Sequence, residues 1–303
     1  MELIRPDTRY DFIGKKKFTL WVSAIAILIS LGSVFFHGGL KYGVDFAGGI
    51  LLQIKFSKIV DISEVRNALE AIGSKEAMVQ KFGGENEFLI RVEKASGDLE
   101  EMSRKIQSSL QGQFKDNALE IRRAEVVGPK VGRDLKEKAI LATVLSFLAI
   151  LLYVAFRFRQ FSYGLGGIVA LVHDIIITFG AISLFELEFS LTLLAVILTI
   201  IGFSINDTIV IFDRVREDVK KMRKESLETI FNTSINECLG RTILTSGTVM
   251  MVVLILFFFG GPVIHDFTTA LIIGLISGTY STIYVASPIV LFWHNHITVK
   301  RKR

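Results

Sequence analysis

The hydrophobic positions of the chain fall into six long blocks, and most polar positions fall between them. A membrane-spanning helix needs roughly 20 mostly apolar residues, and each block is about that long. The core of a soluble protein rarely produces six such blocks, so the pattern predicts a polytopic α-helical membrane protein with six transmembrane helices. The predicted spans are residues 18–36, 138–156, 163–185, 189–212, 238–259 and 267–292.

One long segment, residues 37–137, interrupts the apolar blocks and has the shorter patterns of a water-soluble domain. Some stretches have apolar residues at helical spacing, and others have the alternation or flanking glycines of strands. In chain order we expect a strand over 43–56 with a glycine-marked bend, a helix over 61–73, strands over 78–82 and 88–92, a helix over 98–111 and a strand over 118–127. The order β-α-β-β-α-β is that of the ferredoxin-like unit. We therefore expect a ferredoxin-like α+β domain between the first two spans.

The composition agrees with a membrane protein and argues against an enzyme. Half of the 303 residues are hydrophobic, the mean hydropathy is +0.48, and 21% are charged, against roughly 25% in an ordinary soluble chain. The single cysteine, Cys238, excludes a disulfide framework within the chain and a cysteine-based metal site. The inserted domain has no His/Cys cluster, phosphate loop or Ser/His/Asp set. It is expected to bind or to transmit force, with no cofactor.

The net charge of +5 is distributed as an orientation signal. Lysine and arginine concentrate in the terminal and internal segments 1–17, 157–162, 213–237 and 293–303, whereas the turns 186–190 and 260–266 contain none. Because cytoplasmic loops carry the excess of Lys and Arg, both termini and the 213–237 loop are predicted to be cytoplasmic. Residues 37–137 are then predicted to lie on the outer side. The basic charge thus indicates topology, and no nucleic-acid partner is expected.

Ionisable residues deep inside the predicted spans are costly and mark functional candidates. His173 and Asp174 fall near the middle of the third span. Asp207 lies about six residues before the cytoplasmic end of the fourth span, and Arg241 lies just inside the start of the fifth. By the helical rise per residue, Asp207 and Arg241 lie at a similar depth, within roughly 10 Å of the same surface. Opposite charges at one depth on consecutive helices can pair.

Two interpretations of these charges remain open at the level of residue types. In the first, Asp207 and Arg241 form a static pair that locks two helices, and His173 makes a structural hydrogen bond. In the second, they form a proton relay. Removal from water favours a protonated carboxylate and a nearby guanidinium favours an ionised one, so moving the arginine couples proton binding to helix movement.

Six motifs together resemble the SecF members of the SecD/SecF family of protein-export membrane subunits, over nearly the whole chain. They are VDFAGG at 44–49, HD at 173–174, GFSINDT at 202–208, FDRVRE at 212–217, RTILTS at 241–246 and GTYSTIYVASP at 278–288. The resemblance implies one half of a bundle like that of the resistance-nodulation-division transporters. SecD is then the expected partner that supplies the other half.

The resemblance also implies a function and a location. The expected function is to use the proton-motive force, with SecD, in late-stage translocation and release of an unfolded preprotein in the bacterial inner membrane. The SecYEG channel, YajC and YidC are further expected partners. Asp207 is then the proton-responsive carboxylate and Arg241 its partner, and Asp174 is a second candidate. The expected supporting residues are His173, Asn206 and Thr208.

Two alternative functions remain. The first is a structural subunit that holds SecD and the channel together, with the Asp–Arg pair serving only to join helices. The second is half of a small-molecule exporter of the same superfamily. The chain length disfavours the exporter, because one six-helix half with one small outer domain lacks the second half and the large porter domains.

Overall fold

The computed structural model describes residues 9–74, 77–92, 99–158, 160–261 and 264–301. Among the basic residues on which the orientation argument rests, four lie outside these ranges: Arg5, Arg159, Lys302 and Arg303. The chain divides into two compact units, which are described separately. The helical unit comprises residues 1–41, 143–187 and 192–303, and the α/β unit comprises residues 42–142 and 188–191.

Six helical segments in the described residues are long and apolar enough to cross a membrane. They are α1 (Lys16–Phe36), α5 (Pro129–Arg157), α6 (Phe161–Leu184), α7 (Leu191–Lys221), α8 (Leu227–Phe259), and the series formed by α9 (His265–Ser281), the π-helix η3 (Thr282–Ala286) and α10 (Ser287–Arg301). A short 3₁₀ turn, η1 (Ile13–Lys15), precedes α1. The predicted fold class, a six-helix membrane protein with an inserted α+β domain, is confirmed.

The fourth and fifth spans extend into what the sequence predicted as a long cytoplasmic loop. Helix α7 runs through the charged stretch to Lys221, and α8 already begins at Leu227. The start of α8 is fixed by Ser226, whose hydroxyl accepts a hydrogen bond from the backbone N–H of Thr229 at 3.1 Å, the usual role of an N-cap serine. The predicted loop 213–237 therefore reduces to a turn over 222–226.

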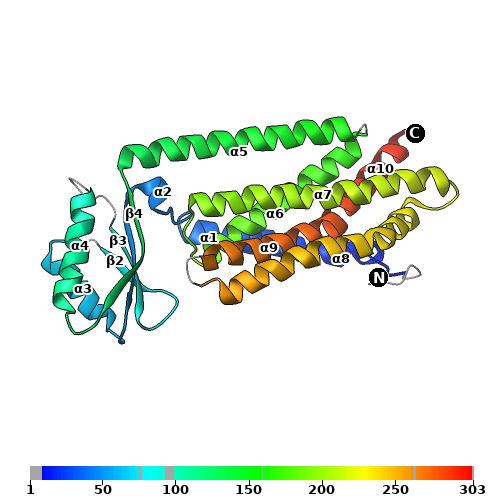
Figure 1. Cartoon of the computed structure of the whole chain (residues 1–303). Coiled ribbons are helices and arrows are strands. Elements are labelled where there is room, and N and C mark those ends of the chain that lie inside the picture. Colours follow the sequence, from blue (N-terminus) through cyan, green and yellow to red (C-terminus); the bar gives the residue numbers. More distant parts are fainter. Residues whose placement is uncertain (1–8, 75–76, 93–98, 159, 262–263, 302–303) are drawn as a thin grey trace. The chain divides into compact units, whose positions relative to one another are not determined.

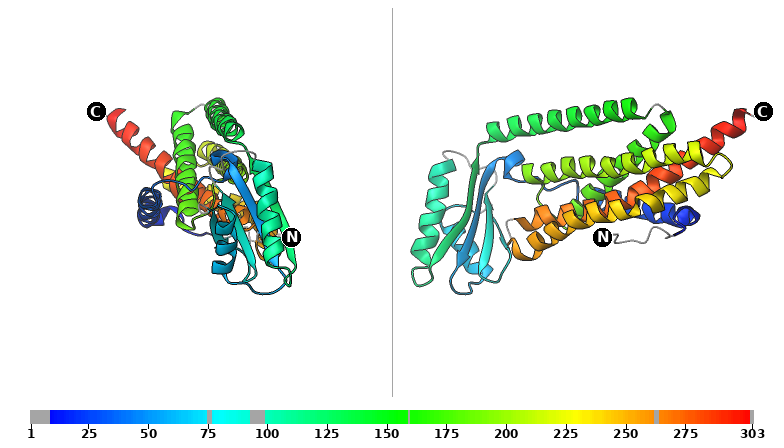
Figure 2. Two further views of the ribbon diagram at one scale, coloured as in Figure 1. Left: turned by 90° about the vertical axis from the view of Figure 1, so that its left-hand side faces the viewer. Right: turned by 45° about the vertical axis from the view of Figure 1, so that its right-hand side comes forward.

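Helix α6 is the centre of the helical unit and packs against α1, α9 and α10. Helices α8 and α9 lie side by side (Figures 1 and 2). At one crossing, a Cβ atom added to Gly166 on α6 would lie 2.8 Å from the carbonyl oxygen of Ala286. Glycine at this position allows the backbones of α6 and η3 to approach closely.

The α/β unit contains a four-stranded antiparallel sheet in the order β2-β3-β1-β4. Its elements are α2 (Val44–Ala47), β1 (Gly49–Phe56), α3 (Ile62–Ala71), β2 (Met78–Lys81), β3 (Glu87–Val92), α4 (Leu99–Gln113) and β4 (Leu119–Val127). Helices α3 and α4 cover one face of the sheet (Figure 1). This arrangement is the ferredoxin-like one predicted from the element order.

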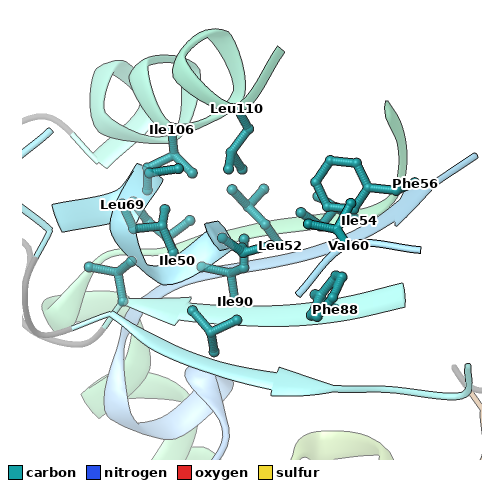
Figure 3. Packing of buried hydrophobic residues seen from close by; sticks show 14 residues of the cluster. Ile50, Leu52, Ile54, Phe56, Val60, Leu69, Phe88, Ile90, Ile106 and Leu110 are labelled. Atoms are coloured by element: carbon teal, nitrogen blue, oxygen red, sulfur yellow. The ribbon is translucent and has the colours of Figure 1, made fainter. Parts of the chain in front are cut away.

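The core of this unit lies between the sheet and its two helices (Figure 3). Alternate residues of β1 and β3 point into it, because successive side chains of a strand face opposite sides. The fully enclosed members include Leu52, Phe56, Phe88, Ile106 and Leu110.

The start of the first strand differs from the sequence prediction. Residues Val44–Ala47 form a one-turn helix, and β1 begins only at Gly49. The reason is the backbone of Gly48 and Gly49, with φ of +76° and +127°, which side-chain-bearing residues rarely adopt. A Cβ atom on Gly48 would also lie 3.0 Å from Cα of Pro129. The glycine pair thus turns the chain sharply beside the start of α5.

Candidate functional site

The predicted site residue Asp174 lies on α6 at the centre of a polar cluster within the helical unit. Its side chain is completely buried, and both carboxylate oxygens are occupied by hydrogen bonds. Ser204 on α7 donates to Oδ2 at 2.6 Å, and Ser281 on α9 donates to the same oxygen at 2.7 Å. Ser277 on α9 donates to Oδ1 at 2.6 Å. One carboxylate therefore connects three helices.

The fourth contact of Asp174 is the neighbouring residue His173, whose Nδ1 lies 3.0 Å from Oδ1 of Asp174. His173 is 4% exposed. Its ring stacks on that of Tyr280 on α9, with centroids 6.1 Å apart, and its Nε2 atom has no hydrogen-bond partner among the described residues. His173 is the only group among the four contacts of Asp174 that can carry a positive charge.

A carboxylate with four acceptor positions filled is matched to its ionised form, because the ionised group only accepts hydrogen bonds. Hydroxyl bonds to a charged oxygen are short and strong, which compensates for the loss of water around Asp174. A proton added to Asp174 turns one oxygen into a donor. At least one of the three serines must then rotate or move away.

Asp207 forms a second, looser polar cluster about one turn further along α7. It is 3% exposed, and Ser246 on α8 donates a hydrogen bond to its Oδ2 at 3.4 Å. Ser246 in turn accepts a hydrogen bond from Thr279 on α9 at 3.1 Å. Because Asp207 follows Ser204 by three residues, the two clusters lie within about one turn of the same helix.

The expected pairing of Asp207 with Arg241 is not present in this structure. No ion pair within 4.0 Å joins them in the described part of the chain, and the Arg241 side chain is exposed on α8. Equal depth along two helices fixes the height of each residue. It does not fix the direction in which each side chain points around its helix, and packing decides that direction.

The two remaining predicted residues occupy different environments. Thr208 is buried, and its hydroxyl lies 2.9 Å from that of Thr282, the first residue of η3. Asn206 is exposed and faces away from both carboxylates' clusters. The structure therefore brings Asp174, His173 and Thr208 into one packed region around α9, and it leaves Asn206 and Arg241 on the surface.

Sequence reasoning missed the hydroxyl groups that surround the carboxylates. None of Ser204, Ser246, Ser277, Tyr280 and Ser281 was identified as a contact of a carboxylate from the sequence. The spacing of four residues between Ser277 and Ser281 on α9 was a usable signal, because residues four apart lie on one face of a helix. Among the described residues, no group of three or more His, Cys, Asp or Glu side chains could hold a metal ion.

Comparison with known proteins places this site in a family. Residues 105–296 match the family "Protein export membrane protein SecD/SecF, C-terminal", and residues 33–58 match the "SecD/SecF GG Motif". The protein translocase subunit SecF of Magnetococcus marinus is 43% identical over 295 residues, covering 96% of this chain and 94% of the relative. The chain belongs to the SecF branch of the SecD/SecF family.

Other relatives support the same family assignment. The protein translocase subunit SecF of Pseudomonas aeruginosa is 40% identical over 285 residues, covering 94% of this chain and 91% of the relative. The crystal structure of SecDF from Thermus thermophilus superimposes with a TM-score of 0.84 at 36% identity, over 97% of this chain and 40% of that one. SecDF in its super-membrane-facing form gives a TM-score of 0.70. The chain thus spans less than half of SecDF.

Family membership makes this chain a multi-pass membrane subunit of the Sec protein-export pathway. The matched segments include the features described above. The glycine pair at the start of β1 lies in the segment matched by the GG motif. The clusters around Asp174 and Asp207 lie in the segment matched by the C-terminal family description.

Proposed function

We propose that this SecF-family chain binds and releases protons at its buried carboxylates and so converts the proton-motive force into movement of its helices. With a SecD partner, that movement drives the late stage of preprotein translocation and release. The observation that supports this most strongly is Asp174, a fully buried carboxylate whose four contacts come from α6, α7 and α9. The proposal requires no catalytic step and no cofactor beyond the proton gradient.

The coupling follows from the hydrogen bonds of Asp174. Ionised Asp174 holds Ser204 on α7 and both serines of α9 against α6. Protonated Asp174 accepts fewer bonds, so the connection between the helices weakens. Ser281 immediately precedes η3, a five-residue π-helix. Single π turns inside α-helices frequently occur at functional sites. We assign η3 the change in helix geometry that follows release of Ser281.

Asp207 and Arg241 complete the cycle in this proposal. Arg241 lies close to Asp207 in one conformation of the chain and away from it in another. The structure described above corresponds to the conformation in which Arg241 lies away. In place of Arg241, the Ser246 hydroxyl contacts Asp207. Since Ser246 is also bonded to Thr279 on α9, a change at Asp207 reaches the same helix that Asp174 holds.

The proposed assembly follows from the family and from the exposed surfaces. This chain corresponds to 40% of the SecDF chain, and we propose that a SecD protein supplies the remaining helices. Apolar side chains on α1, α5 and α8, including Trp21, Leu152 and Val252, are exposed. They face lipid or that partner. We propose that SecYEG, with YajC or YidC, completes the machine.

The proposed orientation follows the positive-inside rule. Both termini lie in the cytoplasm, the ferredoxin-like unit lies on the outer side of the bacterial inner membrane, and that unit meets the emerging preprotein.

The proposal is tested by preprotein translocation into proteoliposomes containing the complete Sec complex, with and without a proton gradient. Asp174→Asn and Asp207→Asn are each expected to abolish the gradient-dependent part of export, because neither amide can bind and release a proton at physiological pH. The matched control is Asp116→Asn, which removes an exposed carboxylate from the α/β unit. Gradient-dependent export at the control's rate in both variants would refute the proposal.

A purely structural subunit is the second candidate, and the dense bonding around Asp174 favours it as well. The two functions predict different results for Asp174→Asn. An amide preserves the shape of the side chain, so a structural role leaves export near the control's rate once the complex has formed. Co-purification with SecD checks that the complex has formed. Loss of gradient-dependent export in an intact complex then excludes the structural function.

A further inference from the structure

A cavity of about 260 Å³ lies at one end of the helical unit, where α6 begins and α7 ends. Its walls come from α6, α7, α8 and α10, so four helix ends meet around it. The cavity is separate from the carboxylate clusters, and none of the residues proposed above to bind or relay protons lines it. Polar and apolar side chains line the same cavity, and this combination points to a ligand that has both a polar and an apolar part.

The polar lining includes an unsatisfied tyrosine. Tyr163 is 6% exposed, yet its hydroxyl has no hydrogen-bond partner among the described residues. Its ring is fixed by Phe158 and Phe212, with centroids 6.1 and 5.2 Å away. The Tyr163 hydroxyl is accessible from the cavity and can donate a hydrogen bond to a ligand that enters it.

The start of α6 offers further donors to the same space. Gln160 is the N-cap residue of α6 and lines the cavity, and its side chain makes no capping hydrogen bond. The first N–H groups of a helix have no partner within the helix. They carry the positive end of the helix dipole, so they favour an anion. Ser162, in the first turn of α6, adds a hydroxyl to the lining.

The charge of the lining is positive. Arg216 and Lys220 lie four residues apart on α7, and His294 comes from α10. Among the described residues, no acidic side chain lines the cavity. The ion-pair partner of Arg216 is Asp213 at 3.4 Å, and Arg157 also binds Asp213. Two arginines therefore share the single negative charge of Asp213, so one positive charge remains available to an anion.

The remaining lining is apolar and consists of Val219, Leu227, Phe231, Val290 and Leu291. A free inorganic anion gains nothing from such a surface, whereas the glycerol and first acyl carbons of a lipid are matched to it. We propose that this cavity binds an anionic phospholipid, with the phosphate among Tyr163, Arg216 and Lys220. Basic pockets between transmembrane helices are a known way to hold acidic headgroups. The inference does not depend on proton coupling.

Native mass spectrometry of the purified full chain in detergent tests the site by titration with dioleoylphosphatidylglycerol. The double variant Arg216→Gln/Lys220→Gln is expected to bind this lipid at least about tenfold more weakly, because two charge-assisted contacts are lost. Tyr163→Phe is expected to weaken binding several-fold. The matched control is Lys224→Gln, which removes one exposed charge from the adjacent 222–226 turn without touching the cavity.

Further ligands in the same experiment identify the source of the phosphate. Dioleoylphosphatidylcholine has the same acyl chains without the net negative charge, and dioleoylglycerol lacks the phosphate. Both are expected to bind more weakly than phosphatidylglycerol. Inorganic phosphate is expected not to displace the lipid. Equal lipid affinity in the double variant and the control would overturn the proposed site, and displacement by inorganic phosphate at equal concentration would overturn the lipid as its ligand.

Discussion

Asp174 is a carboxyl group with no exposed surface, and its four hydrogen-bond contacts take the place of water. Its three serine contacts measure 2.6, 2.6 and 2.7 Å, the range of short hydroxyl bonds to an ionised oxygen. Removing one donor leaves a buried charge incompletely satisfied, which costs more than the net contribution of an ordinary hydrogen bond. The three serines should therefore matter for stability out of proportion to their size.

Ser281→Ala is expected to lower the free energy of unfolding by about 1–3 kcal/mol, the penalty for leaving a buried polar group without its partner. Thermal unfolding in detergent measures this loss. Thr248→Ala is the control, because the Thr248 hydroxyl bonds only within α8, to the carbonyl of Thr245. A loss no larger than that of Thr248→Ala would show that the Ser281 contact contributes nothing to Asp174.

In the α/β unit, Asp61 provides a pH-dependent contribution at the start of α3. Hydrogen bonds from the hydroxyl and the backbone N–H of Ser63 lower the pKa of Asp61 below its usual value. A carboxyl whose pKa is lower in the folded state stabilises the fold above its unfolded pKa of about 4. That stabilisation is lost as the pH falls through the lower, folded-state value.

Hydrogen exchange of the first-turn amides of α3 measures this effect. Protection in the wild type is expected to decrease as the pH is lowered below about 4. Asp61→Asn, which still caps the helix but does not ionise, should show no such decrease beyond the intrinsic exchange rate. Parallel pH dependence in both proteins would disprove the role of the Asp61 charge.

The sequence could not specify which side chains contact the two buried carboxylates. Burial of Asp174 and Asp207 followed from their positions within apolar blocks. The partners of Asp174 come from residues 30 to more than 100 positions away, and only the packing of α6, α7 and α9 brings them together. Arg241 does not contact Asp207 in this structure for the same reason, since the direction of its side chain around α8 is a tertiary property.

At the scale of elements, α6 and η3 approach each other closely at Gly166. Around Gly166, the nearest atoms to an added Cβ are Cγ2 of Val290 at 2.6 Å and the Ala286 carbonyl oxygen at 2.8 Å. The side chain can rotate, but the carbonyl belongs to the backbone of η3 and can move only with that helix. A larger residue here must separate α6 from η3.

Gly166→Ala is accordingly expected to destabilise the bundle by about 1–3 kcal/mol, the usual cost of overpacking, and to reduce export. Gly247→Ala on α8 is the matched control, because nothing lies within 4 Å of its added Cβ. Alanine there should be neutral or stabilising, since it favours helix more than glycine does. Thermal unfolding of both variants measures the difference, and equal stability would show that α6 and η3 have room to adjust.

Elements with a strong hydrophobic period were predictable, and elements set by local backbone geometry were not. Alternation along β2 and β3 and the helical spacing of α3 and α4 predicted the ferredoxin-like core. Several boundaries differed, including the start of α5 at Pro129, nine residues before the predicted span, and two of them show the reason. The conformation of Gly48 made α2 a helix, and the Ser226 cap extended α8 by eleven residues before position 238.

At the scale of the whole molecule, this chain corresponds to 40% of a SecDF chain, and its exposed apolar helices fit a larger membrane assembly. The six apolar blocks and their charged flanks were sufficient to predict a membrane subunit. The blocks and the flanks could not indicate that Asp174 would contact three serines. They also could not indicate that Asp207 would not contact Arg241. Proton coupling in the assembly depends on whether these carboxylates change their protonation.

Infrared difference spectroscopy of the chain reconstituted with SecD, recorded between neutral and acidic pH, tests this directly. A protonated carboxyl group in an apolar site absorbs separately from the ionised carboxylate. The proposed mechanism predicts that such a band appears on acidification in the wild type and in Asp116→Asn. Part of it should be absent in Asp174→Asn and another part in Asp207→Asn. Identical difference spectra in the wild type and both buried-site variants would contradict proton binding at these residues.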